Sequence, residues 1–113
     1  MTTRQLDKKA CRTYFDYLSR FFEGKQAEIE VASLSLGDQI EAEWLPLLGI
    51  TYDPKDDVVE VALDGVDHLI AKPRKIEIED GGGELISIEI VDAEGTKQIV
   101  KLRDPLMLPA AAH

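Results

Sequence analysis

The sequence predicts an α+β fold that is mainly β, with one N-terminal helix packed on a bent, mostly antiparallel sheet of six strands or a small barrel. Apolar residues recur every three or four positions over residues 7–23. From residue 26 to about residue 103, apolar and polar residues instead alternate in short runs. No second helical segment is available to connect parallel strands, so the strands are expected to follow one another as hairpins.

The helix is expected over residues 7–23, with Asp7 as its N-cap and Gly24 as its C-terminal stop. Its apolar stripe comprises Ala10, Cys11, Tyr14, Phe15, Leu18, Phe21 and Phe22. A stripe of this width on a 3.6-residue period is typical of a helix that buries one face. We therefore expect it to pack on the sheet, with Cys11 in the core and not acting as a nucleophile.

Six strands are predicted from the alternation, at residues 26–33, 38–44, 58–64, 74–80, 85–91 and 97–103. The expected inward residues are Ala27, Ile29, Val31, Ile40, Ala42, Trp44, Val59, Val61, Leu63, Ile76, Ile78, Ile86, Ile88 and Ile90. In the last strand the inward pair is either Ile99 and Lys101 or Val100 and Leu102. The turn positions predict registers that pair Ile29 with Trp44, Tyr52 with Val59, and Ile78 with Ile86.

Pro46 interrupts the run that contains Trp44 and Tyr52. Because proline cannot donate a hydrogen bond to a central ladder, the strand should bend or bulge there. Trp44 and Tyr52 then lie on two arms of one bent strand, which is how small barrels close.

Length and charge limit the functions that this chain can support. The 113 residues fit a single domain, 1–113, and carry a net charge of −9. Residues 1–24 hold five basic and three acidic side chains, whereas the rest hold eight basic and nineteen acidic ones. Such an acidic body disfavours nucleic acid and anionic membranes as partners. The lone Cys11, and the absence of a long apolar run or a signal-like N-terminus, favour a cytoplasmic location.

Asp67 and His68 are the most suggestive pair for acid–base chemistry. Neighbouring residues on a strand point to opposite faces, so Asp67 orients His68 only if this stretch is a turn. No nucleophile motif accompanies them, and a structural role for His68 is favoured, with "VDHLIAKP" carrying the chain from one strand to the next. The acidic loops lack calcium-binding spacing, and "GGGE" lacks the helix and lysine of a phosphate loop, so no metal or cofactor is expected.

The predicted outer face of the sheet is rich in glutamate. Its members are Glu28, Glu30, Glu41, Glu43, Glu60, Glu77, Glu79 and Glu89. Glu30 is expected opposite Glu43, where like charges cost stability. A solvated surface interleaved with lysines is the favoured interpretation, and a docking face for a basic partner is the alternative. The apolar tail, residues 104–109, includes Leu106 and Met107, which either pack on the sheet or form a subunit contact.

Three stretches carry a resemblance: "IEAEWLPLLGITYDPKDDVVEVALDGVDHLI", "KIEI" and "VDAEGTKQIVKLRDPLMLP". They resemble a family of small bacterial proteins known only as a domain of unknown function. The resemblance covers nearly the whole chain and implies a bacterial, cytoplasmic protein without assigning an activity. In layout alone, the predicted fold is similar to SH3-like and Sm-like barrels, which does not determine a function.

The leading hypothesis is a non-catalytic, cytoplasmic protein-interaction domain with an acidic surface, and a homo-oligomer is left open. Glu30, Glu43, Leu106 and Met107 are the predicted interaction residues. The alternative is a small-ligand-binding protein or an enzyme with a pocket near Trp44, Tyr52, Asp67 and His68.

Overall fold

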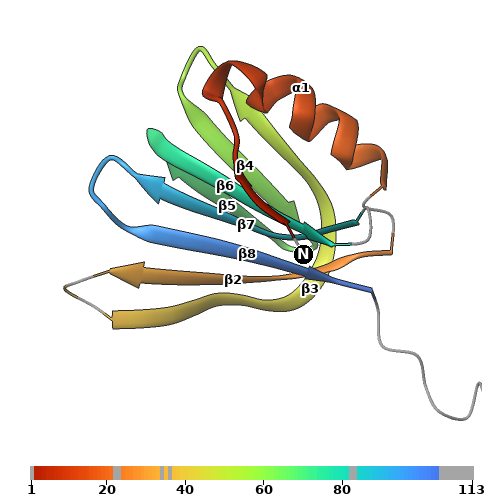
Figure 1. The fold of residues 1–113 in the computed structure, drawn as a ribbon. Coiled ribbons are helices and arrows are strands. Elements are labelled where there is room, and N and C mark those ends of the chain that lie inside the picture. The colour runs from red at the N-terminus through yellow and green to blue at the C-terminus, as the bar shows by residue number, and fades with distance from the viewer. Residues whose placement is uncertain (1, 22–23, 34, 36, 82–83, 105–113) are drawn as a thin grey trace, which may run out of the picture.

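The computed structural model describes residues 2–21, 24–33, 35, 37–81 and 84–104. Within these residues, one helix packs on an eight-stranded antiparallel sheet (Figure 1). The elements are β1 (Thr2–Gln5), α1 (Lys8–Leu18), the 3₁₀ turn η1 (Ser19–Phe21), β2 (Gln26–Ser33), β3 (Gly37–Asp53), β4 (Val58–Leu63), β5 (Val66–Ala71), β6 (Pro73–Gly81), β7 (Glu84–Asp92) and β8 (Lys97–Arg103). The strand order is β1-β6-β7-β8-β2-β3-β4-β5.

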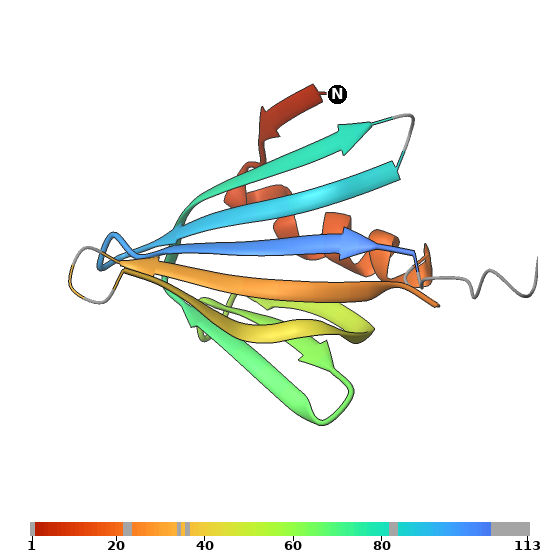
Figure 2. The same cartoon turned by 90° about the horizontal axis from the view of Figure 1, so that it is seen from below.

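The mainly β fold with one helix is confirmed, but the expectation of six strands or a closed barrel is wrong. The additional strands are β1 and β5. β1 has the sequence "TTRQ", which lacks apolar alternation, and β5 comes from the stretch expected to be a connector. These two strands lie at opposite ends of the strand order, so the sheet stays open (Figure 2).

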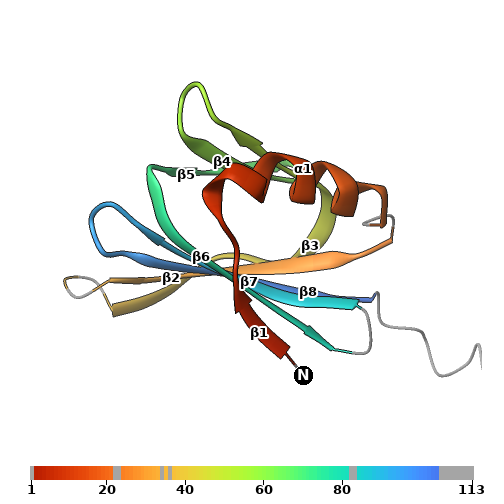
Figure 3. The same ribbon diagram turned by 45° about the horizontal axis from the view of Figure 1, so that its top comes forward.

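β3 is a 17-residue strand that links two parts of the sheet. Its first part pairs with β2, and its second part, from Leu47 onward, pairs with β4. Figure 3 shows β3 curving from the layer that contains β2 and β8 to the layer that contains β4 and β5. Trp44 adopts a positive φ of 50°, and Pro46 follows it, so the predicted bend is confirmed at this position.

The core lies between α1 and the inner face of the curved sheet. Asp7 is the N-cap, as predicted, and its carboxylate accepts a hydrogen bond from the backbone N–H of Lys9 at 3.1 Å. Cys11 and Phe15 are fully buried. At the helix end, Ser19 Oγ lies 2.9 Å from the carbonyl oxygen of Phe15 and 3.1 Å from that of Ile50, which ties α1 to β3.

Most of the predicted inward residues are buried, including those of β4, β6 and the described part of β7. In β8 the inward pair is Val100, fully buried, and Leu102, half-buried. Ile40 is a wrong prediction, because 52% of its surface is exposed. It lies in the part of β3 where two register shifts against β2 change which side chains face inward.

Two of the three predicted registers are wrong, and both fail at irregularities. The pairing of Tyr52 with Val59 is confirmed. Ile29 pairs with Ala42 and not with Trp44, because the β2–β3 ladder is irregular on both sides of Ile29. Likewise, Ile78 pairs with Ile88 and not with Ile86, and the β6–β7 ladder shifts between Glu79 and Asp80. A bulge inserts an unpaired residue that alternation alone does not reveal.

Candidate functional site

The four residues of the predicted pocket lie in different surroundings. Trp44 and Tyr52 are on the two arms of β3, and Asp67 and His68 are on β5. β5 is extended, so the last two side chains point to opposite faces of the sheet. Asp67 is exposed on the outer face, whereas His68 faces the core side together with its register partner Val61.

His68 belongs to a chain of polar side chains that connects β5 with β8. Its Nε2 atom lies 2.5 Å from Oε1 of Gln98. The Nε2 group of Gln98 donates to Oδ2 of Asp92 at 3.2 Å, and this orients the amide so that His68 donates the proton. Asp92 Oδ1 also accepts the backbone N–H groups of Glu94 and Thr96. Through these contacts His68 links β5 to β8, which are far apart in the strand order.

Sequence reasoning did not identify Gln98, a buried polar residue of the core with 8% of its surface exposed. The signal was present in the alternation of Gln98, Val100 and Leu102, which place a polar residue on the inward face of β8. A buried amide needs partners, and His68 on β5 and Asp92 at the end of β7 supply them.

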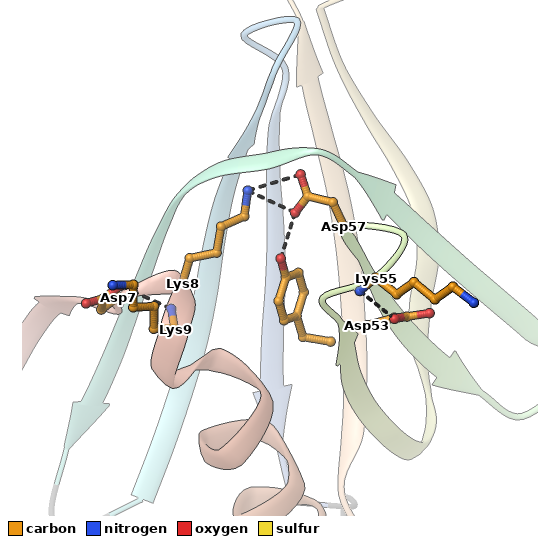
Figure 4. Close-up of polar contacts among 7 residues, drawn as sticks. Asp7, Lys8, Lys9, Asp53, Lys55 and Asp57 are labelled. Atoms are coloured by element: carbon orange, nitrogen blue, oxygen red, sulfur yellow. Dashed lines mark hydrogen bonds and ion pairs between the residues drawn. The ribbon is translucent and has the colours of Figure 1, made fainter.

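Tyr52 forms a second polar cluster, with Asp57 and Lys8 (Figure 4). Its hydroxyl donates to Oδ1 of Asp57 at 2.7 Å, and Nζ of Lys8 lies 2.9 Å from the same oxygen. Burial, followed by the neighbouring Asp57 carboxylate, raises the pKa of Tyr52 to about 12. The hydrogen bonds from Lys8 and Tyr52 lower the pKa of Asp57. This cluster links the start of α1 to the turn between β3 and β4.

Trp44 is half-buried and stacks on a cation. The guanidinium carbon of Arg103 lies 4.0 Å from the centre of the indole ring. Nε of Arg103 donates to Oε1 of Gln26 at 3.0 Å, which holds the guanidinium in place. This cation–π contact links β8 to β3, which lie on the two sides of β2.

The outer faces of β2, β6, β7 and β8 carry glutamates that have lysine partners. Lys101 lies 3.6 Å from Glu30 and 3.8 Å from Glu28. Lys97 pairs with Glu89 at 3.6 Å, and Lys75 pairs with Glu77 at 3.5 Å. The predicted contact between Glu30 and Glu43 is wrong, because the register partner of Glu30 on β3 is Ile40.

The outer face of β3, β4 and β5 has a different character. The register aligns Thr51, Glu60 and Leu69 in one row and Gly49, Ala62 and Asp67 in the next. Among the described residues, neither Glu60 nor Asp67 has an ion-pair partner, and Leu69 leaves 60% of its surface exposed. We call this surface the docking face and define it by Thr51, Glu60, Ala62, Asp67 and Leu69.

Leu106 and Met107 lie outside the described residues. The described part of the chain holds no group of three or more His, Cys, Asp or Glu side chains that could bind a metal ion. Over the same part, no helix has the length and apolar character needed to cross a membrane.

The geometry thus defines a class of small α+β protein with an open antiparallel sheet and a partly acidic outer surface. The chain matches the "Family of unknown function (DUF5335)" over residues 2–111, and it belongs to this family. It is 41% identical over 110 residues to an "Uncharacterized protein" of Aquifex aeolicus (strain VF5), covering 96% of this chain and 99% of the relative. The predicted resemblance to an uncharacterised bacterial family is therefore confirmed. No solved structure matches the chain.

Proposed function

We propose that this protein is a non-catalytic, cytoplasmic interaction domain that binds a basic segment of a partner protein through the docking face. The observation that carries the proposal is the contrast between two outer surfaces. Glu28, Glu30, Glu77 and Glu89 have lysines within 4 Å, whereas Glu60 and Asp67 have no ion-pair partner among the described residues.

The docking face also offers an apolar anchor beside its carboxylates. Leu69 is 60% exposed and is the register neighbour of Glu60 on β4. A basic segment with an apolar side chain can bury Leu69 while its ammonium or guanidinium groups approach Glu60 and Asp67. Complementary charge gives such a contact its specificity and speed of association, and the apolar contact contributes to its lifetime.

The alternative, a small-ligand site near Trp44, Tyr52, Asp67 and His68, has weaker support. The hydroxyl of Tyr52 is already hydrogen-bonded to Asp57, and Nε2 of His68 is already hydrogen-bonded to Gln98. A ligand in this region would therefore have to displace internal hydrogen bonds, which carries a cost of about 1–3 kcal/mol for each buried group left unpaired.

A peptide titration tests the proposal. We expect ¹⁵N-labelled protein titrated with a lysine octapeptide to show its largest amide shifts on β4 and β5. The double variant Glu60→Gln/Asp67→Asn should weaken binding by about tenfold, because it removes the two carboxylates of the docking face. The matched control Glu77→Gln/Glu89→Gln removes the same charge from the surface where lysines are already paired. Equal weakening by the two double variants would contradict the proposal that the peptide binds at the docking face.

A further inference from the structure

β5 stands last in the strand order of the sheet. The direction in which each of its backbone N–H and C=O groups points can be assigned residue by residue. Among the described residues, β5 pairs with β4 alone, starting at Leu63 and Val66, which flank the two-residue turn of the hairpin. In such a hairpin the flanking pair is hydrogen-bonded, and hydrogen-bonded pairs recur at every second position. The bond from the N–H of Lys72 to the carbonyl of Asp57, at 2.8 Å, continues the same series.

The even-numbered residues of β5 therefore form their backbone hydrogen bonds with β4. The N–H and C=O groups of Asp67, Leu69 and Ala71 point the other way, to the open edge of the sheet. Figure 2 shows the β4–β5 hairpin at one margin of the molecule and β1 at the other. Within the described residues, no strand pairs with this edge of β5.

This edge has few of the features by which proteins protect an end strand, and its acidic side chain is Asp67. Val66–Ala71 contains neither proline nor lysine, and its ladder with β4 is free of bulges. The other end strand, β1, is shorter, with four residues, and it carries Arg4. A regular six-residue edge without proline or lysine is a template for another strand.

We propose that two copies of this chain pair through β5, antiparallel, around a two-fold axis at Leu69. An axis through an odd-numbered residue puts that residue in a hydrogen-bonded pair with its own copy, whereas an axis through His68 or Ile70 puts that residue in a non-hydrogen-bonded pair. Leu69 is chosen because an axis there places the exposed leucines of the two copies opposite each other. With the axis at Leu69, Asp67 lies opposite the partner's Ala71, and all five residues from 67 to 71 find partners. An axis at Asp67 would instead place this carboxylate against the partner's Asp67, which like-charge repulsion disfavours.

The second copy is also favoured by the exposed apolar side chain at the axis. Leu69 is 60% exposed in one copy, and the two-fold places it beside the partner's Leu69 on the same side of a continuous sheet. The docking faces of the two copies become one surface. The inference goes beyond the proposed function, because the contact is made by the strand edge and needs no basic partner.

The dependence on salt concentration distinguishes the pairing of two copies through β5 from the binding of a basic peptide to the docking face. Each chain carries a net charge of −9, so two copies repel each other, and screening should strengthen their pairing. Binding of a lysine octapeptide should weaken under the same change. Raising the NaCl concentration from about 20 mM to about 300 mM therefore moves the two equilibria in opposite directions.

Sedimentation of the full chain over a range of concentrations tests the pairing. We expect a monomer–dimer equilibrium that Ala71→Lys tightens and Ala71→Glu weakens, each by about threefold or more, since position 71 faces the partner's Asp67. Leu48→Lys and Leu48→Glu are the matched controls, because Leu48 is 65% exposed and lies outside β5. They apply the same charge changes away from the proposed interface.

Leu69→Pro supplies a second, backbone test. It removes an N–H that points to the open edge and leaves the bonds between β4 and β5 in place, so it should abolish the dimer while circular dichroism stays native. A chain that remains monomeric at all concentrations overturns the proposal. So does a dimer that responds equally to the changes at positions 71 and 48. Peptide binding by a strictly monomeric chain would support the docking face and would refute the dimer.

Discussion

Replacing Tyr52 with phenylalanine tests the cluster that joins α1 to the β3–β4 turn. The variant keeps the aromatic ring, which is 7% exposed, and removes only the hydroxyl that donates to Asp57 at 2.7 Å. A hydrogen bond to a charged acceptor contributes about 1.5–3 kcal/mol, and half-exposure of Asp57 places the value near the lower end. We expect the free energy of unfolding at pH 7 to fall by about 1.5 kcal/mol.

Alkaline pH gives the same substitution a second, sharper test. The pKa of Tyr52 is raised to about 12 in the folded protein, from 10 in the unfolded chain. Because the pKa of Tyr52 is higher in the folded state, its protonated hydroxyl stabilises the folded protein. This stabilisation is complete below pH 10 and is lost as the pH rises toward 12. With these two values, linkage predicts a loss of about 1.4 kcal/mol between pH 7 and pH 11 in the native protein and not in Tyr52→Phe.

The assay is urea unfolding of both proteins at the two pH values, followed by circular dichroism. The stability difference between them should shrink by about 1.4 kcal/mol from pH 7 to pH 11. Tyr14, whose pKa is also raised by burial, is present in both proteins, so its direct contribution cancels in the comparison. A difference that stays constant across this range would refute the assignment of a buried, carboxylate-bonded hydroxyl.

Three further substitutions test other contacts by urea unfolding. Phe15→Ala removes a fully buried ring from the helix–sheet core and should cost about 3–5 kcal/mol, and a loss below about 1 kcal/mol would contradict its central position. His68→Ala leaves the buried Oε1 of Gln98 without its donor and should cost about 1–3 kcal/mol, whereas unchanged stability would favour the small-ligand alternative. Asp7→Ala should cost about 1 kcal/mol through the lost N-cap, and Asp7→Asn, which keeps an acceptor, should restore most of it.

The alternation of apolar residues predicted most of the core, because one face of each strand must be buried on a curved sheet. It worked best where the ladder is regular, as for Val59 and Val61 on β4. The bend in β3 was also predictable, since Pro46 has no N–H to donate to a central ladder. The helix start followed from the capping chemistry of Asp7.

The sequence did not predict the features that depend on tertiary pairing. The four residues of β1 show no alternation, so only their pairing with β6 identifies them as a strand. Bulges beside Ile29 shift the register of β2 against β3 and leave Ile40 exposed. The link from His68 to Gln98 joins residues 30 positions apart, and it depends on how far the sheet curls, which local patterns do not encode.

The candidate site was predicted in part. An acidic outer surface and a lone histidine were visible from composition and spacing. Which carboxylates have lysine partners depends on the cross-strand register, so Glu30 and Glu60 could not be told apart by sequence. The free edge of β5 was missed because Val66–Ala71 was expected to be a connector.

Residue-resolved amide hydrogen exchange at two protein concentrations tests the central claim most directly. At low concentration we predict slow exchange for His68 and Ile70, which bond to β4, and fast exchange for Leu69 and Ala71, which face the open edge. At high concentration the edge amides should become protected while the other two stay slow. Slow exchange of Leu69 and Ala71 in the dilute protein, or no change with concentration, would contradict a free β5 edge that pairs with a second copy.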